Sequence, residues 1–298
     1  MEVNYDPFYN TLQGDANPFW AEPLGRFGIP FTTEEADVAF WDARQARYSD
    51  DATVRRYLSK GLILDGDAAR ILCERGYGEY LGITAGEDVL KARPRLVYDL
   101  GACEIITDDF VPADEGRELY SAHDYCPAGN GVWCELSDPA PETQIISCGY
   151  DFSGNIIAPT MTLFQNALGG QVVVMSLTLK NNPSQAIFNN RRQRLLQRLA
   201  ARMSDEYPFV ENAPDVYMIA QEPKADADFR FILTLINLCD DDAENLSVYL
   251  PPKMRNAKAF CTIAQDGSIT ELGCERHENG IRLLSPLRYC EPVYVIGK

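Results

Sequence analysis

The feature that most constrains the fold is an alternation of short apolar runs and helical segments between residues 28 and 78. Short strands are expected at 28–32, 37–41 and 62–64, and the run at 37–41 is short enough for a buried parallel strand. Asp50 and Asp65 stand where each following helix would begin, and aspartate is a preferred N-cap residue. This strand–helix–strand–helix order predicts a parallel sheet with right-handed crossovers.

Two glycines are expected to end these helices. Lys60-Gly61 follows the first helix, and Arg75-Gly76 follows the second. Glycine after a helix terminus readily adopts the left-handed conformation that stops it. The run holds only about three convincing strands, whereas doubly wound domains have about five or six. We therefore expect an incomplete α/β layer that lacks its first strand.

After this layer the pattern changes twice. Between 95 and 179, period-two alternation and apolar bursts predict a β-rich segment within the first domain. A long amphipathic helix at about 185–203 is then expected to close that domain, which we place at residues 1–211. From 212 to 298, short strand-like runs separated by turns predict a small antiparallel β-sandwich. The predicted fold class is α/β followed by an all-β domain.

Charge and hydropathy limit the partners. The chain has 27 basic and 44 acidic side chains, a formal net charge of −17. Such a surface repels phosphate backbones, so we expect no nucleic-acid partner and no anionic membrane partner, whereas neutral sugars are compatible with it. No run approaches the roughly 20 apolar residues of a membrane span. The N-terminus has no basic start followed by an apolar run, which favours a cytoplasmic location.

Cysteine and histidine usage bears on metals and disulfides. Nine cysteines, an odd number, include no Cys-x-x-Cys pair, a pattern typical of free buried thiols in a reducing compartment. His123 and His277 are the only histidines. A structural zinc site needs about four clustered ligands, so we expect neither a metal nor a cofactor.

Candidate catalytic groups have simpler structural interpretations. Cys148 with His123 would need a sharp strand-to-helix turn at the nucleophile, but Ser147-Cys148-Gly149 leads into a strand and a turn. A buried thiol and a loop histidine are the alternative interpretation.

A pair of carboxylates roughly 5–10 Å apart could cleave glycosides. The acids beside predicted strand ends are Asp65, Glu74, Asp99, Asp108 and Asp109. Asp65 is explained by capping, and Asp108-Asp109 by a solvated turn. We assign no catalytic residue.

Other polar runs and the tryptophans suggest binding at most. Asp240-Asp241-Asp242 lacks the spacing of a calcium loop and is predicted to be a hairpin tip. The helical stripe of Arg191, Arg194, Arg198 and Arg202 is interpreted as a solvated face paired with carboxylates, and alternatively as an anion or partner surface. Trp20 and Trp133 are candidates for stacking on sugar rings, whereas Trp41 ends an apolar strand and is assigned to the core.

Several segments together resemble a known family. They are Gly28–Thr32 before Ala36–Phe40, Leu58–Ala69 with the sequence Leu-Ser-Lys-Gly-Leu-Ile-Leu-Asp-Gly-Asp-Ala-Ala, Leu72–Gly78, Leu81-Gly82, Asn166–Val174 and the arginine-rich helix. They are similar to the region that follows the catalytic barrel in certain bacterial glycoside hydrolases, the β-galactosidase trimerisation domain. That domain has a flavodoxin-like, class I glutamine-amidotransferase-like fold and is followed by a β-sandwich.

The resemblance implies an accessory role in assembly or in shaping a cleft. In such hydrolases the catalytic carboxylates lie on a barrel, which needs about 200 residues or more that this chain does not contain. The Gly-x-Cys-x-Gly elbow of amidotransferases is also missing from the sequence. Catalytic residues of neither family can therefore be assigned to positions here.

Three functions follow as hypotheses. The first is a non-catalytic accessory and oligomerisation portion of a β-galactosidase-type protein in carbohydrate metabolism, its partner a second copy or an upstream barrel. The second is a carbohydrate-binding protein that uses Trp133 or Trp20. The third is an autonomous glycoside hydrolase with an unrecognised carboxylate pair.

Overall fold

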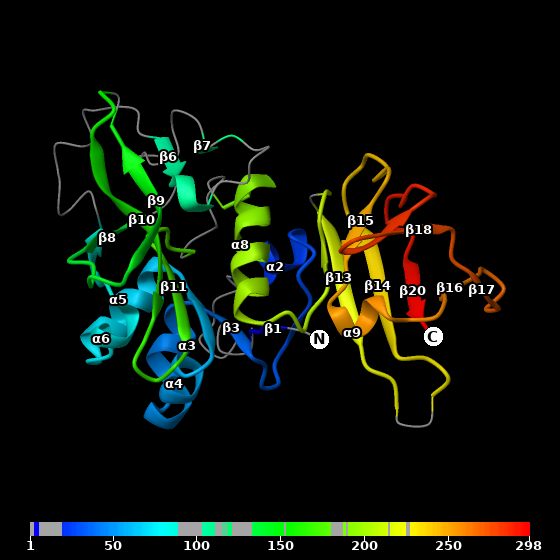
Figure 1. Cartoon of the computed structure of the whole chain (residues 1–298), viewed down its shortest axis with the longest axis horizontal. Helices are drawn as coiled ribbons and strands as arrows, with labels where there is room; N and C mark the ends of the chain where they lie inside the picture. Colours follow the sequence, from blue (N-terminus) through cyan, green and yellow to red (C-terminus); the bar gives the residue numbers. More distant parts are fainter. Residues whose placement is uncertain are drawn as a thin grey trace. The chain divides into compact units, whose positions relative to one another are not determined.

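A computed structural model shows how the chain folds (Figure 1). It describes residues 3–5, 20–88, 103–110, 116, 118–120, 133–151, 153–179, 187–188, 190–213, 215–224 and 227–298. By density of contacts the chain divides into two compact units. We call residues 5–20 and 37–192 the α/β unit, and residues 1–4, 21–36 and 193–298 the β-rich unit.

The α/β unit contains three neighbouring parallel strands. They are β3 (Val38–Trp41), β4 (Gly61–Leu64) and β11 (Gln171–Met175), in the order β3-β4-β11. Val38 pairs with Gly61, and Val172 pairs with Leu62. The parallel pairing of β3 and β4 confirms the sequence prediction. The addition of β11 was not predicted, because more than a hundred residues separate it from β4.

Four short helices cover one face of these strands. They are α3 (Ala43–Tyr48), α4 (Asp51–Leu58), α5 (Gly66–Glu74) and α6 (Gly78–Leu81). Alternate strand residues such as Trp41, Leu64 and Val174 join the helices in one buried cluster. Burial of apolar surface contributes about 25 cal/mol per Å², so this cluster stabilises the packing of the helices on the strands.

The predicted helix ends are confirmed at one position and corrected at another. Gly76 has φ +88, the left-handed backbone that ends α5. Gly61 instead begins β4, because α4 already ends at Leu58 with Ser59 as its C-cap.

An antiparallel group extends the same sheet beyond β11. Its strands are β10 (Ile156–Gln165), β9 (Gln144–Tyr150), β6 (Cys103–Ile106) and β7 (Glu118–Tyr120), in that order. A separate pair joins β5 (Thr84–Asp88) to β8 (Cys134–Ser137), and a 3-10 turn, η2, covers Asp108–Phe110. The predicted β-rich segment is thus present where the structure describes it.

The longest helix, α8, covers Asn190–Met203 and passes from one unit into the other between Arg192 and Gln193. This division differs from the predicted boundary at 211. Gln197 donates to the carbonyls of Phe27 (2.7 Å) and Val210 (2.6 Å) through its Nε2, so most of the helix belongs with the β-rich unit.

The β-rich unit has two antiparallel sheets. One has the order β12-β15-β19-β18 and the other β13-β14-β20-β16-β17. The strands of the first are β12 (Phe209–Val210), β15 (Ser247–Tyr249), β19 (Gly280–Leu283) and β18 (Cys274–His277). Those of the second are β13 (Val216–Gln221), β14 (Phe231–Asn237), β20 (Val293–Gly297), β16 (Phe260–Ile263) and β17 (Ile269–Glu271). Both sheets supply one buried cluster that includes Val248 and Leu233.

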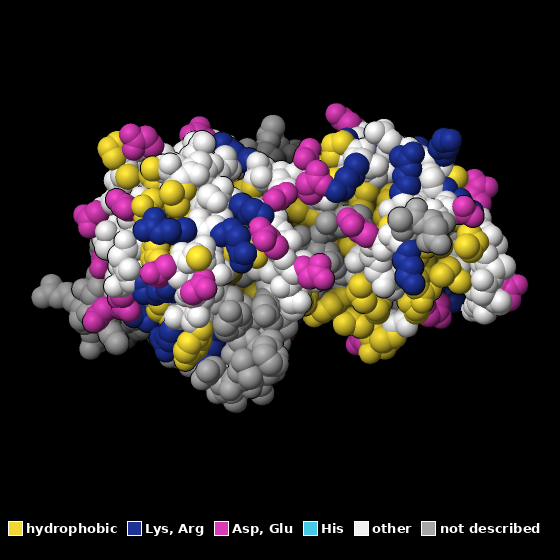
Figure 2. Space-filling model, turned by 90° about the horizontal axis from the view of Figure 1, so that it is seen from below, with side chains coloured by type: hydrophobic (Ala, Val, Ile, Leu, Met, Phe, Trp, Pro, Cys, Tyr) yellow, Lys and Arg dark blue, Asp and Glu magenta, His cyan; other side chains and the backbone are white. Residues whose placement is uncertain are grey.

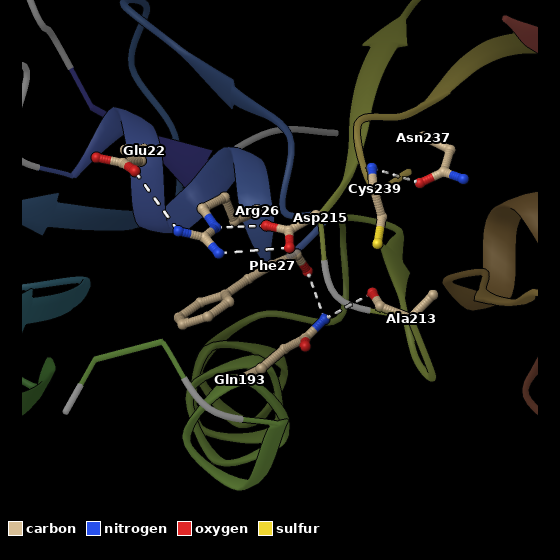
Figure 3. A network of polar contacts seen from close by, with 8 residues as sticks. All are labelled: Glu22, Arg26, Phe27, Gln193, Ala213, Asp215, Asn237 and Cys239. Carbon is tan, nitrogen blue, oxygen red and sulfur yellow. Dashed lines mark hydrogen bonds and ion pairs between the residues drawn. The ribbon is translucent and has the colours of Figure 1, made fainter. Parts of the chain in front are cut away.

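N-terminal elements complete this unit. Strand β1 (Val3–Asn4) pairs in parallel with β2 (Phe31–Thr32), and helix α2 covers Ala21–Arg26. Arg26 binds Asp215 through two guanidinium nitrogens and lies 3.6 Å from Glu22 (Figure 3). Gln193 donates to the Phe27 carbonyl at 3.3 Å, so chain segments far apart in sequence are joined here. In the part of the chain that the structure describes, no helix has the length and apolarity needed to cross a bilayer.

The coarse fold prediction agrees with this architecture. Helices account for 23% of the residues and strands for 38%. The strands belong to several sheets, so the fold is of mixed α/β type. The hairpin tip predicted at Asp240-Asp241-Asp242 is wrong: this segment connects β14 of the five-stranded sheet to β15 of the four-stranded sheet, and these two strands do not pair.

Candidate functional site

Two carboxyl side chains follow the ends of neighbouring parallel strands. Asp42 comes directly after β3, and Asp65 directly after β4. The carboxyl ends of parallel strands are the edge at which open α/β sheets usually bind ligands. This edge is therefore the candidate ligand-binding site of the α/β unit.

Asp42 is completely buried and its carboxylate is fully engaged. Oδ1 accepts from the Arg44 amide at 2.8 Å, and Oδ2 accepts from the hydroxyl of Tyr5 at 2.9 Å. The Asp42 amide in turn donates to the side chain of Gln45, which makes a capping box at the start of α3. Asp42 thus begins a helix and anchors the chain at Tyr5.

Asp65 is 1% exposed and engaged to the same degree. Oδ1 accepts from the Ala68 amide at 2.8 Å and caps α5, while Oδ2 accepts from the Leu179 amide at 2.9 Å. Burial, and then the neighbouring charge of Asp42, raise the pKa of Asp65 well above its ordinary value, although the two amides oppose this shift. Its predicted role as an N-cap is confirmed.

A buried carboxyl with a raised pKa can mark an acid–base site. Here each of the four carboxyl oxygens accepts a hydrogen bond from this chain. A general acid must also reach its substrate, and these side chains are 0% and 1% exposed. The arrangement therefore favours a structural role, in which the two carboxylates cap helices and bind Tyr5 and Leu179, over proton transfer to a ligand.

A second buried polar cluster lies on the antiparallel part of the sheet. Glu104 of β6 forms an ion pair with Arg192 of α8, and both side chains are at most 1% exposed. Ser147 of β9 donates to Glu104 at 2.8 Å and lies 2.7 Å from the hydroxyl of Thr160 on β10. Such a network is sealed from solvent and ties α8 to three strands.

Sequence reasoning did not identify this cluster. Glu104 is the single acid within the apolar run Cys103–Ile106, and that isolation is the signal that could have found it. Arg192 lies beside the predicted stripe rather than in it. Of the predicted stripe, Arg194 and Arg202 are exposed, whereas Arg191 and Arg198 are half-buried, so only part of the stripe is a solvated face.

Trp20 and Trp133 require a correction. Both side chains are 0% exposed, and the ring of Trp20 contacts Phe40 edge-on with a centroid distance of 4.9 Å. A ring that stacks on a sugar needs a solvent-exposed face, so neither tryptophan is retained as a sugar contact. Trp41 is also buried, which confirms its assignment to the core.

The remaining candidates lie as follows. Cys148 is 8% exposed, and burial, with Glu104 nearby, raises the pKa of its thiol, which opposes formation of a nucleophilic thiolate.

His123 and Asp99 lie outside the described residues. Glu74 pairs with Arg70 at 2.5 Å, and Asp109 is exposed in η2. Seven cysteines in the described ranges are free thiols, and no three potential metal ligands cluster among those residues.

Comparisons with known proteins add no assignment. No protein-family model matches the chain, and no curated protein matches it.

Proposed function

We propose that this chain is an accessory and oligomerisation portion of a glycoside-hydrolase-like protein of the β-galactosidase type. In this proposal the α/β unit is an incomplete amidotransferase-like layer and the two antiparallel sheets form the following β-sandwich. The observation that carries the proposal is the closed carboxyl edge: Asp42 and Asp65 are buried, and each uses both carboxyl oxygens to hold its own chain.

An apolar sheet face supports the assembly role. Met218 and Leu233 of the five-stranded sheet face the core, so Ile219 and Ile232, their neighbours, face outward. Outward isoleucines also pair on β16 and β17, where Ile263 opposes Ile269. Figure 2 shows hydrophobic side chains gathered on the β-rich unit.

Exposure makes this face unusual. Ile219 is 48% exposed and Ile269 is 52% exposed. The outward face of an antiparallel sheet is commonly polar, and exposed apolar patches mark contact surfaces. The resemblance implies assembly through the α/β layer. Because this exposed apolar face lies on the β-rich unit, we propose instead that a second copy of the chain covers it.

Sedimentation velocity on the full chain tests the proposal. We expect the wild type to sediment faster than a 33.3 kDa monomer as concentration rises. Ile219→Lys with Ile269→Lys should weaken association about tenfold or more, because each buried charge opposes contact. Ile156→Lys is the matched control, since Ile156 is 61% exposed but lies on β10 of the α/β unit. A wild type that remains monomeric throughout would refute the assembly role.

Turnover assays test the accessory part independently. Chromogenic galactosides and glucosides should not be hydrolysed by this chain alone. Hydrolysis that survives purification would instead support an autonomous enzyme.

A further inference from the structure

The four-stranded sheet of the β-rich unit turns one face to the core and the other outward. Val210 and Ile281 belong to the buried cluster, so their neighbours Glu211 and Arg282 face outward. On β18, the guanidinium of Arg276 lies over the buried ring of Phe260, 4.5 Å from its centroid. The next residue, His277, therefore lies on the outward face with Glu211.

Glu211 and His277 approach one another from opposite edges of this sheet. Glu211 follows β12 and His277 ends β18, with β15 and β19 between those strands. Even so, Nε2 of His277 lies 3.6 Å from Oε2 of Glu211. The nearest cross-strand neighbour of Glu211 is Ser247 and that of His277 is Gly280, both small. Arg282 and Tyr249 occupy the other outward positions on the two central strands. A Cβ on Gly280 would lie 1.9 Å from the Val248 carbonyl oxygen, so no larger residue fits there.

The other imidazole nitrogen is also engaged. Nδ1 of His277 accepts from the Asn279 amide at 3.3 Å, so the neutral ring carries its proton on Nε2, which has no hydrogen-bond partner among the described residues and lies 3.6 Å from Glu211. Asn279 lies in the turn between β18 and β19, and its carbonyl accepts from the Leu250 amide at 2.9 Å. The adjoining Glu278 carbonyl accepts from Arg255 at 2.9 Å. His277 thus joins a tethered turn to the far edge of the sheet.

Charged and titratable groups face this pair from each neighbouring element. They are Arg282 of β19, its cross-strand partner Glu275 of β18, Tyr249 of β15, Arg255 of α9 (Pro252–Arg255), and Asp205, which follows α8 and acts on Tyr249. Burial raises the pKa of Glu211, while His277 and Arg282 oppose that shift. An unperturbed imidazole changes charge between pH 5 and 8.

Protonation would change both contacts of His277 at once. A proton on Nδ1 turns that atom from an acceptor into a donor, so it can no longer accept from the Asn279 amide. The same proton gives the ring a positive charge 3.6 Å from the Glu211 carboxylate. One contact is lost where the other becomes an ion pair.

We propose that His277 is a proton-operated latch of the β-rich unit. Neutral His277 holds the turn between β18 and β19 through Asn279. Protonated His277 releases that amide and pairs with Glu211 across the outward face of the sheet. The latch loosens the turn between β18 and β19 in weakly acidic conditions.

Amide exchange of Asn279 in the full chain tests the latch. With ¹⁵N-asparagine labelling, protection relative to the intrinsic exchange rate is compared at about pH 8 and about pH 5.5. Wild-type protection should fall about fivefold on acidification, the equivalent of one ordinary hydrogen bond. In His277→Gln the amide side chain does not titrate, so Asn279 protection should not depend on pH. Equal wild-type protection at the two pH values overturns the proposal.

Glu211→Gln tests the second contact. Loss of the carboxylate removes the partner of the protonated ring, so release of the Asn279 amide should shift to lower pH. The same release pH in Glu211→Gln and wild type would exclude Glu211 from the latch. The wild-type measurement does not depend on any variant's folding, and the outcome is independent of whether the chain self-associates.

Discussion

At the scale of single residues, Asp65 and Asp50 offer a matched pair of helix caps. Asp65 is buried and Asp50 is exposed, yet each accepts from the amide three residues on, at 2.8 and 2.7 Å. Burial raises the pKa of Asp65, whereas hydrogen bonds from Thr53 lower the pKa of Asp50. The two caps should therefore respond to pH in opposite directions.

The direction of each pH dependence follows from whether the folded or the unfolded state binds the carboxyl proton more tightly. The folded state binds the Asp65 proton more tightly than the unfolded state does, so this contribution is greatest at low pH and declines as pH rises. We expect Asp65→Ala to lower the free energy of unfolding by about 1–3 kcal/mol, through loss of the cap and of the Leu179 contact, and by more at pH 4.5 than at pH 7.5. Urea unfolding at the two pH values measures this.

Asp50→Ala is the control. Its lowered pKa means that its stabilisation is present at neutral pH and declines on acidification, so its effect should be larger at pH 7.5. Parallel pH trends in the two variants would contradict this assignment of the carboxyl environments.

Residues such as Asp50 and Asp65 were predictable because cap, helix and strand are contiguous in the sequence. Asp42 could have been found in the same way, since Gln45 stands three residues after it in a capping-box pattern. Trp20 was misjudged because a tryptophan's burial depends on what folds over it, and its contact with Phe40 spans two segments. Partners on distant strands, such as Glu211 and His277, leave no local pattern.

At the scale of elements, the Glu104–Arg192 pair holds α8 to β6 across 88 positions of sequence. Removing one partner of a buried ion pair leaves an uncompensated charge, at a cost of about 3–5 kcal/mol. Arg192→Met alone should therefore destabilise the α/β unit strongly. The double variant Glu104→Leu with Arg192→Met should be markedly more stable than the sum of the single effects predicts.

Denaturant unfolding of the wild type, Glu104→Leu, Arg192→Met and the double variant measures the coupling energy between Glu104 and Arg192. Arg202→Met, which removes an exposed arginine from the last turn of the same helix, should change stability by less than about 0.5 kcal/mol. Strict additivity of the two single variants would show that the ion pair contributes nothing specific.

Elements were predicted well where the sequence is locally periodic and less well where pairing is remote. The apolar runs at 37–41 and 62–64 predict β3 and β4, and the intervening helix predicts their parallel pairing. Strand β11 was recognised as a strand, but its parallel place beside β4 depends on a chain reversal that periodicity does not encode.

At the scale of the whole molecule, each unit has its own hydrophobic cluster, and α8 belongs to both units along the chain. Separate cores favour separate cooperative transitions. We expect calorimetry to resolve two unfolding transitions. Leu62→Ala, in the α/β cluster, should lower only one of them, and Leu233→Ala, in the β-rich cluster, only the other.

Both leucines are 0% exposed, so each truncation should cost about 2–5 kcal/mol and be readily visible. Because α8 is one continuous helix, unfolding of either unit removes support from part of it. A single transition that both variants lower equally would mean that this helix makes the two cores one cooperative structure. Two independent shifts would mean that the helix can end at the boundary near Arg192, so that each unit unfolds without the other.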